Sequence, residues 1–182
     1  ETPAWPEADI GAKNAIETAI TSLSSACQRE RLPDPFSKII DYHAAVFAAE
    51  NSHYYGPFLD NHSELLSEKL RDRLIVSKTT LASEYIAALN ARDKIYHSLE
   101  ALLDDYDAVL CLAATGAAPI GFETTGSAIF NGLWTYLGVP CLSLPLLTTE
   151  KMPLGLQLVG KRGDERKLFE TANWIENHLK AS

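Results

Sequence analysis

The chain has 182 residues, of which 46% are hydrophobic, and a formal net charge of −8 at pH 7. A chain of this length can bury about 70% of its unfolded surface, so one domain spanning residues 1–182 is expected. No run approaches the ~20 apolar residues that cross a bilayer, and no basic tract could neutralise a row of phosphates. We therefore expect neither a membrane nor nucleic acid as a direct partner.

The first half of the chain, residues 1–106, is predicted to be mainly helical. Apolar stripes with helical spacing place helices at residues 9–26, at 36–50, from Asn61 or Ser63 through Leu74, and at about 80–104. The aromatic sequence Tyr54-Tyr55-Gly56-Pro57 is expected to end the second of these helices as a turn.

The periodicity changes at Asp107, and residues 107–182 are predicted to form a sheet with helices. Ala108 to Leu112 is apolar throughout, which is typical of a strand buried on both faces. A helix at 127–137, strands at 141–146 and 154–159, and a final helix capped by Asp164 should follow. This order predicts α/β layers. Because few strands are present, we expect Ala108–Leu112 and Leu154–Val159 to be interior strands of a sheet whose other strands lie outside this chain.

Candidate catalytic and metal-binding groups would come from the serines, histidines and cysteines. A serine nucleophile needs a base and an oxyanion site of backbone N–H groups. Ser127 follows a glycine but stands where a helix N-cap is expected, and Ser24-Ser25 lies late in an alanine-rich helix. The histidines never occur at the i, i+4 spacing of two ligands on one helical face. We assign no catalytic residue, no metal and no cofactor to the chain.

The three cysteines, Cys27, Cys111 and Cys141, are widely spaced and odd in number. Such a set predicts no disulfide framework. Free thiols fit a reducing compartment, so a cytoplasmic location is expected.

The loop from Thr115 to Gly126 is the best candidate for a binding site. It leaves the carboxyl end of the first predicted strand, where ligands gather in open α/β sheets. The candidate substrate-binding residues are Thr115, Gly116, Thr125 and Gly126 in the loop and Phe130, Asn131 and Trp134 on the next helix. In the alternative interpretation the glycines only allow turns, Phe130 and Trp134 belong to the core, and Asn131 satisfies local backbone groups.

Several motifs in the second half occur together and in order. They are Asp107 to Leu112, Phe130-Asn131-Gly132-Leu133-Trp134-Thr135, Gly138 to Pro145, Pro153 to Gly160, and Gly163-Asp164. Together they resemble the carboxy-terminal part of amidase signature enzymes, and Trp5-Pro6 with the helix after it extends the likeness over almost the whole chain. Two positions depart from that pattern: Ala113-Ala114-Thr115 lacks the usual proline, and Gly132 stands where an arginine is common.

The resemblance implies the α/β/α fold of that family, with a central mixed sheet flanked by helices. It also implies that residues 1–182 are the carboxy-terminal portion of a longer amidase domain. In that family a Ser, cis-Ser and Lys triad forms an acyl-enzyme, and none of the three has a counterpart here. The complete protein is then expected to hydrolyse a small-molecule carboxamide.

Further expectations concern the partners. This chain alone should be inactive and should pair with the amino-terminal catalytic part of the same enzyme, while association into homo-oligomers is left open. The alternatives are a non-catalytic binding or assembly subunit, and a fragment of an A-type amidotransferase subunit.

Overall fold

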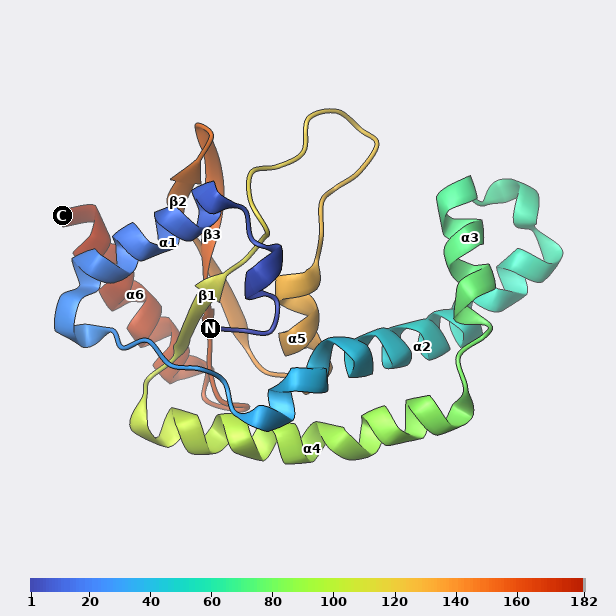
Figure 1. Cartoon of the computed structure of the whole chain (residues 1–182), viewed down its shortest axis with the longest axis horizontal. Helices are drawn as coiled ribbons and strands as arrows, with labels where there is room; N and C mark the ends of the chain where they lie inside the picture. Colours follow the sequence, from blue (N-terminus) through green and yellow to red (C-terminus); the bar gives the residue numbers. More distant parts are fainter. Residues whose placement is uncertain (182) are drawn as a thin grey trace.

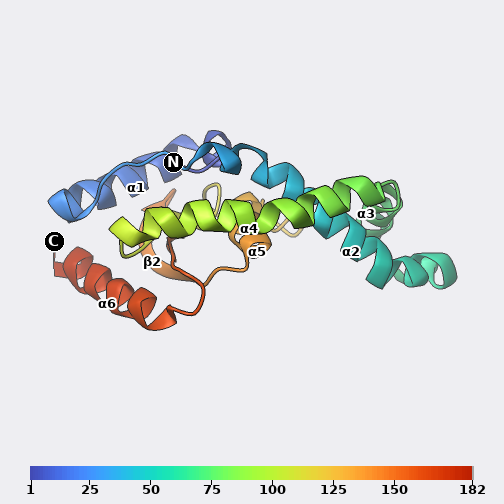
Figure 2. The same ribbon diagram turned by 90° about the horizontal axis from the view of Figure 1, so that it is seen from below.

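The computed structural model describes residues 1–181 and shows a sheet-containing body from which a helical arm projects. In Figure 1 the body lies to the left and the arm to the right. Helix α4 (Ala82–Asp105) runs beneath both, and Figure 2, seen from below, shows it crossing the molecule from arm to body.

The other α-helices and the strands have the following bounds. The helices are α1 (Ile10–Leu23), α2 (Ile39–Asn61), α3 (Glu68–Ser77), α5 (Ile129–Leu137) and α6 (Glu165–Ala181). The strands are β1 (Val109–Leu112), β2 (Cys141–Thr149) and β3 (Met152–Val159). Short 3-10 helices occur at Trp5–Glu7, Ser24–Ala26, Asp34–Lys38 and Ser63–Leu65.

Within residues 1–181 the strands form one sheet of order β1-β3-β2, and both pairings are antiparallel. Gln157 on the central strand β3 is opposite Cys111 on β1 and Ser143 on β2. β3 is thus an interior strand, as expected from its apolar sequence. β1 is buried at Cys111 and Leu112 and partly buried at Val109 and Leu110, and it lies at an edge of the described sheet.

The turn between β2 and β3 has an unusual composition. Glu150 and Lys151 connect the two strands, and their φ angles are +51° and +64°. A two-residue hairpin loop with positive φ at both positions matches the right-handed twist of its strands, although asparagine and glycine usually supply it. No local sequence signal marked this hairpin, so the sequence predicted two strands without predicting how they are joined.

Helices cover both faces of the sheet. α1 and α6 contact each other and β2 on one face, while α5 lies on the other (Figure 1). Helix α5 ends at Gly138, whose φ of +62° lets its N–H and that of Val139 bond back to the last turn. Because α1 shares a hydrophobic core with the strands, the mainly helical first half and the sheet-forming second half pack as one unit.

The arm corrects one expectation. Helix α2 does not end at Tyr54–Pro57 but continues through Gly56 and Pro57 to Asn61. Gly56 is buried against α3, where a Cβ would lie 3.6 Å from Lys78 Cε. Because tertiary packing of α3 on α2 supports the helix there, the local turn signal is overridden.

No helix among residues 1–181 is both long and apolar enough to cross a membrane. The two longest, α2 and α4, carry charged residues along their length.

Candidate functional site

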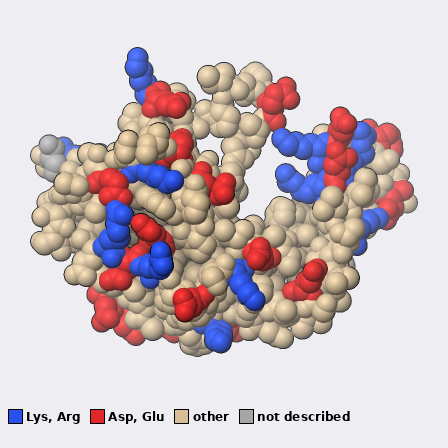
Figure 3. Space-filling view, in the orientation of Figure 1, with Lys and Arg blue, Asp and Glu red and all other residues tan. Residues whose placement is uncertain are grey.

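The loop between β1 and α5 occupies the position that the sequence indicated as a candidate site. It stands away from the body in Figure 1, and at its tip Ile120 and Phe122 are 103% and 106% exposed. Lys69 of α3 donates a hydrogen bond to the Glu123 carbonyl at 3.0 Å, and this contact links the loop to the arm. The space-filling view in Figure 3 shows a hollow between loop and arm.

The base of the loop is held by a buried polar network. Asn131 on α5 donates from Nδ2 to the Ala113 carbonyl at 3.0 Å, and its Oδ1 accepts from Gln157 Nε2 at 2.8 Å. The buried Cys111 thiol donates in turn to Gln157 Oε1 at 3.4 Å. Both ends of the Asn131 amide are therefore engaged by protein groups.

A second set of contacts holds the next residues. The Asp9 backbone N–H donates to the Thr115 carbonyl at 2.8 Å, and Asp9 Oδ1 accepts from the Ala12 N–H at 2.6 Å, which caps α1. A Cβ built on Gly116 would overlap the Asp9 carboxylate. Glycine at 116 thus leaves space for the Asp9 carboxylate and has no unusual backbone angle.

The far end of the loop is built differently. Thr125 and Gly126 are exposed, and Gly126 has a φ of +87° and donates its N–H to Thr124 Oγ1 at 3.1 Å. Ser127 Oγ accepts from the Ile129 N–H at 3.3 Å. Ser127 thus satisfies a free N–H at the start of α5, although Ala128 occupies the N-cap position itself.

The two aromatic candidates lie in the core. Phe130 and Trp134 are 0% and 1% exposed, and Trp134 packs against Phe36 with ring centroids 6.4 Å apart. The structure thus brings Asn131 to the base of the loop, the end that carries Thr115 and Gly116. Thr125 and Gly126 lie at the other end of the loop, and both aromatic rings are buried in the core.

Two residues that support the loop were missed by sequence reasoning. Asp9 was considered only as the first residue of the predicted helix at 9–26, whereas it is the N-cap of α1. Gln157 is the single polar residue in Leu154–Val159, a run in which a buried polar group needs a partner. That isolated polar position was the available signal.

His43 lies on the other side of α5. A Cβ on Gly132 would be 2.8 Å from two atoms of the His43 ring, so this imidazole fills the space beside the glycine. The ring also stacks on Phe47 at 5.8 Å, and partial burial lowers its pKa. Gly132 is therefore covered by a histidine from α2.

The cysteines are free thiols. Burial raises the pKa of Cys111 to about 12 and that of Cys141 to about 11, and burial also raises the pKa of Cys27. Because the thiolate is the nucleophilic form, these thiols are unsuited to attack a substrate near neutral pH. Among residues 1–181, no group of three or more His, Cys, Asp or Glu side chains is arranged to hold a metal ion.

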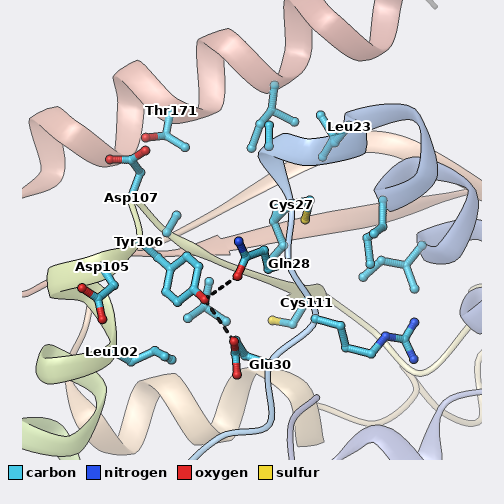
Figure 4. Close-up of a pocket in the computed structure, with 18 of the residues that line it drawn as sticks. Leu23, Cys27, Gln28, Glu30, Leu102, Asp105, Tyr106, Asp107, Cys111 and Thr171 are labelled. Atoms are coloured by element: carbon cyan, nitrogen blue, oxygen red, sulfur yellow. Dashed lines mark hydrogen bonds between the residues drawn. The ribbon is translucent and has the colours of Figure 1, made fainter.

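A groove of about 990 Å³ lies beside β1, away from the loop. Its walls come from α1, α6, β1 and the segment 25–30, as Figure 4 shows. Tyr106 donates its hydroxyl to Glu30 Oε1 at 3.0 Å and lies equally far from Gln28 Oε1. The hydrogen bond to Glu30 raises the pKa of Tyr106. The groove is lined by apolar residues, which include Val109 and Ile175, and by charged residues, which include Glu17 and Arg29.

Comparison with known proteins identifies the scaffold. No family model matches the chain. It is 30% identical over 145 residues to the A subunit of glutamyl-tRNA(Gln) amidotransferase from a Nitratiruptor species, an alignment that covers 74% of this chain and 33% of that protein. It is 29% identical to the corresponding protein of Thermotoga maritima, over 61% of this chain and 26% of that protein.

Solved structures show the same fold. A crystal structure of an amidase superposes on 97% of this chain and 44% of its own with a TM-score of 0.85 at 23% identity. Fatty acid amide hydrolase superposes on 94% of this chain and 37% of its own with a TM-score of 0.78 at 16% identity. A bacterial aryl acylamidase of the amidase signature enzymes gives a TM-score of 0.67 at 14% identity over 95% of this chain and 42% of its own.

The sequence relatives and the fold together show that the chain belongs to the amidase signature family. The chain spans 33% of the length of the Nitratiruptor relative.

Proposed function

We propose that the complete protein containing this chain is an amidase that hydrolyses a small carboxamide through a seryl acyl-enzyme. The Ser, cis-Ser and Lys residues of that mechanism would lie outside this chain, in an amino-terminal catalytic part. The observation that carries the proposal is the superposition of almost the whole chain on less than half of an amidase, with a TM-score of 0.85. On this proposal residues 1–182 are the carboxy-terminal portion of one longer domain.

The contribution of this chain would be a wall of the substrate site. Thr115, Gly116, Thr125 and Gly126 would line it from the loop, with Asn131 at its base. Phe130 and Trp134 would support that wall from the core beneath it. Small side chains and glycines suit such a surface because they let a substrate approach the backbone closely. The mechanism needs no metal or cofactor from these residues.

The amino-terminal catalytic part would seat in the groove beside β1. That groove borders the sheet edge, and an edge strand presents backbone N–H and C=O groups that another strand can pair. Its lining carries both charge signs, including the ion pair between Arg29 and Glu17, and Figure 3 shows acidic and basic side chains gathered on the body. A cytoplasmic location fits the three free cysteines.

A second candidate function is that of an A-type amidotransferase subunit. It is favoured by one observation, since the curated relatives described above carry that name. The two candidates differ in substrate: the first predicts hydrolysis of varied carboxamides, and the second predicts that glutamine is strongly preferred as the nitrogen source.

Ammonia release is the direct test. The complete protein and the 182-residue chain would each be incubated with a panel of simple carboxamides and with glutamine, and labelled with a serine-reactive probe. We expect turnover and labelling of the complete protein and neither for the chain alone. Turnover by the isolated chain that disappears in Ser127→Ala would contradict the proposal, and a complete protein active only on glutamine would favour the second candidate.

A further inference from the structure

The first turn of α1 is wedged between the loop and the sheet. Asp9 contacts the loop through its N–H to the Thr115 carbonyl and through the close approach of its carboxylate to Gly116. Two residues later, a Cβ built on Gly11 would overlap the Thr149 hydroxyl at the end of β2. Thr149 is buried. Both glycines thus allow close approaches of the first turn of α1, one to the loop and one to the sheet.

Asn131 holds the same stretch of backbone from the opposite side. Its amide donates to the Ala113 carbonyl, and its orientation is set by the bond from Gln157 at the centre of the sheet. The carbonyls of Ala113 and Thr115 are thus each bonded to a different helix, α5 and the N-cap of α1. The loop beyond them has an exposed tip at Ile120 and Phe122.

We infer that Asp9 and Asn131 are positioning residues, which hold the backbone of Ala113–Gly116 so that the loop presents one surface to the substrate. This inference rests on the proposed function, because it needs the loop to contact the substrate. Neither residue takes part in bond making. Their effect is geometric, and displacing a substrate-contacting element by about 1 Å can lower a rate about 100-fold.

The decisive variant is Gly116→Ala in the complete protein. Its methyl group would have to displace the Asp9 carboxylate or the Thr115 backbone, and we expect kcat/KM to fall by about 10-fold to 100-fold. Asp9→Ser keeps a side-chain cap and the backbone N–H but removes the crowding carboxylate. The double variant Gly116→Ala with Asp9→Ser should therefore recover most of the lost kcat/KM.

Asn131→Asp tests the other contact. The substitution keeps the shape and the acceptor for Gln157 but removes the N–H that bonds Ala113. We expect kcat to fall by about 10-fold or more in a protein whose far-UV spectrum is unchanged. Unchanged kcat and KM in both Asn131→Asp and Gly116→Ala would overturn the inference.

Amide hydrogen exchange separates this inference from the proposed function. Exchange at residues 113–118 of the complete protein should accelerate in Gly116→Ala and return toward the unaltered rate in the double variant. If exchange does not change, the positioning contacts are overturned even in an active amidase. If exchange changes as expected but the unaltered protein hydrolyses no carboxamide, the proposed function fails, and the positioning role toward a substrate fails with it.

Discussion

Helix α5 and helix α2 both carry aromatic residues but bury very different shares of their length. Helix α5 has nine residues and buries six of them, including Trp134 and Tyr136. Helix α2 has 23 residues and buries three, and on its outer part Tyr54 is 67% exposed. The comparison teaches that position in the fold decides how an aromatic side chain contributes: Trp134 in the body is enclosed, whereas Tyr54 on the outer part of α2 remains exposed.

The largest expected effect sharpens this contrast through aromatic truncation. Trp134→Ala should lower the free energy of unfolding by about 3–5 kcal/mol, because a fully enclosed ring is replaced by a cavity. Tyr54→Ala on the arm should cost less than about 1 kcal/mol. Urea unfolding of both variants measures the difference. Equal losses would mean that the arm is enclosed in the protein as it exists in solution.

A smaller contrast concerns cations. Arg162 donates from Nε to the Leu137 carbonyl at 3.0 Å and lies 3.8 Å from the centre of the Tyr96 ring. Arg162→Ala should therefore cost about 2 kcal/mol, since a charged donor and a cation–π contact are both lost. Lys78→Ala removes the ion pair with Asp60 on the arm and should lower the free energy of unfolding by about 0–1 kcal/mol. A larger loss of thermal stability in Lys78→Ala than in Arg162→Ala would contradict this prediction.

The junction of arm and body offers a pH-dependent test. Tyr136 is buried and donates to the Ala88 carbonyl, and burial raises its pKa from 10.0 to about 12. Because the folded pKa lies above the unfolded one, its stabilising contribution is complete below pH 10 and is lost as the pH rises through 12. Tyr136→Phe should cost about 1 kcal/mol at pH 7. The unfolding free energy of Tyr136→Phe should also decline less steeply above pH 10 than that of the unaltered protein. Equal slopes would mean that ionisation of Tyr136 does not contribute to the loss of stability at high pH.

The smallest expected effect lies between α2 and α5. Alanine is a better helix former than glycine by about 1 kcal/mol, yet Gly132→Ala should destabilise the protein because the new methyl group meets the His43 ring. In a His43→Ala background the same substitution should be neutral or stabilising. A double-mutant cycle of unfolding free energies measures this coupling, and a cycle with no coupling energy would show that the ring moves away without cost.

The sequence predicted the elements of the body better than those of the arm, for a physical reason. The strand Val109–Leu112 and the helix Ile129–Leu137 are bounded by strong local signals, an acidic stop before the strand and Gly138 after the helix, and they were expected within two residues of their ends. Helix α2 passes through Gly56-Pro57 because α3 packs on it, and no local pattern reports a contact between helices.

The candidate site was predicted only in part for a related reason. Asn131 could be predicted because it is a polar residue at the start of the helix that follows the loop. Its partners could not, because Ala113 follows β1 and Gln157 lies on β3. Asp9 is more than a hundred residues away from Gly116 in the sequence. The close approach of Asp9 to Gly116 is created by tertiary packing, so the sequence could suggest a turn or a binding residue at 116 but not this contact.

Proteolytic cleavage at the exposed tip of the loop can measure whether another chain or a substrate covers it. Phe122 stands in a segment without helix or strand, which is the kind of peptide that chymotrypsin cuts first. A cut after Phe122 would leave β1 on one fragment and β2 with β3 on the other, still joined by the pairing of β1 with β3. The nicked molecule should therefore migrate as one species on a sizing column and as two in denaturant. The rate of nicking would then measure how far any bound chain or substrate shelters the loop.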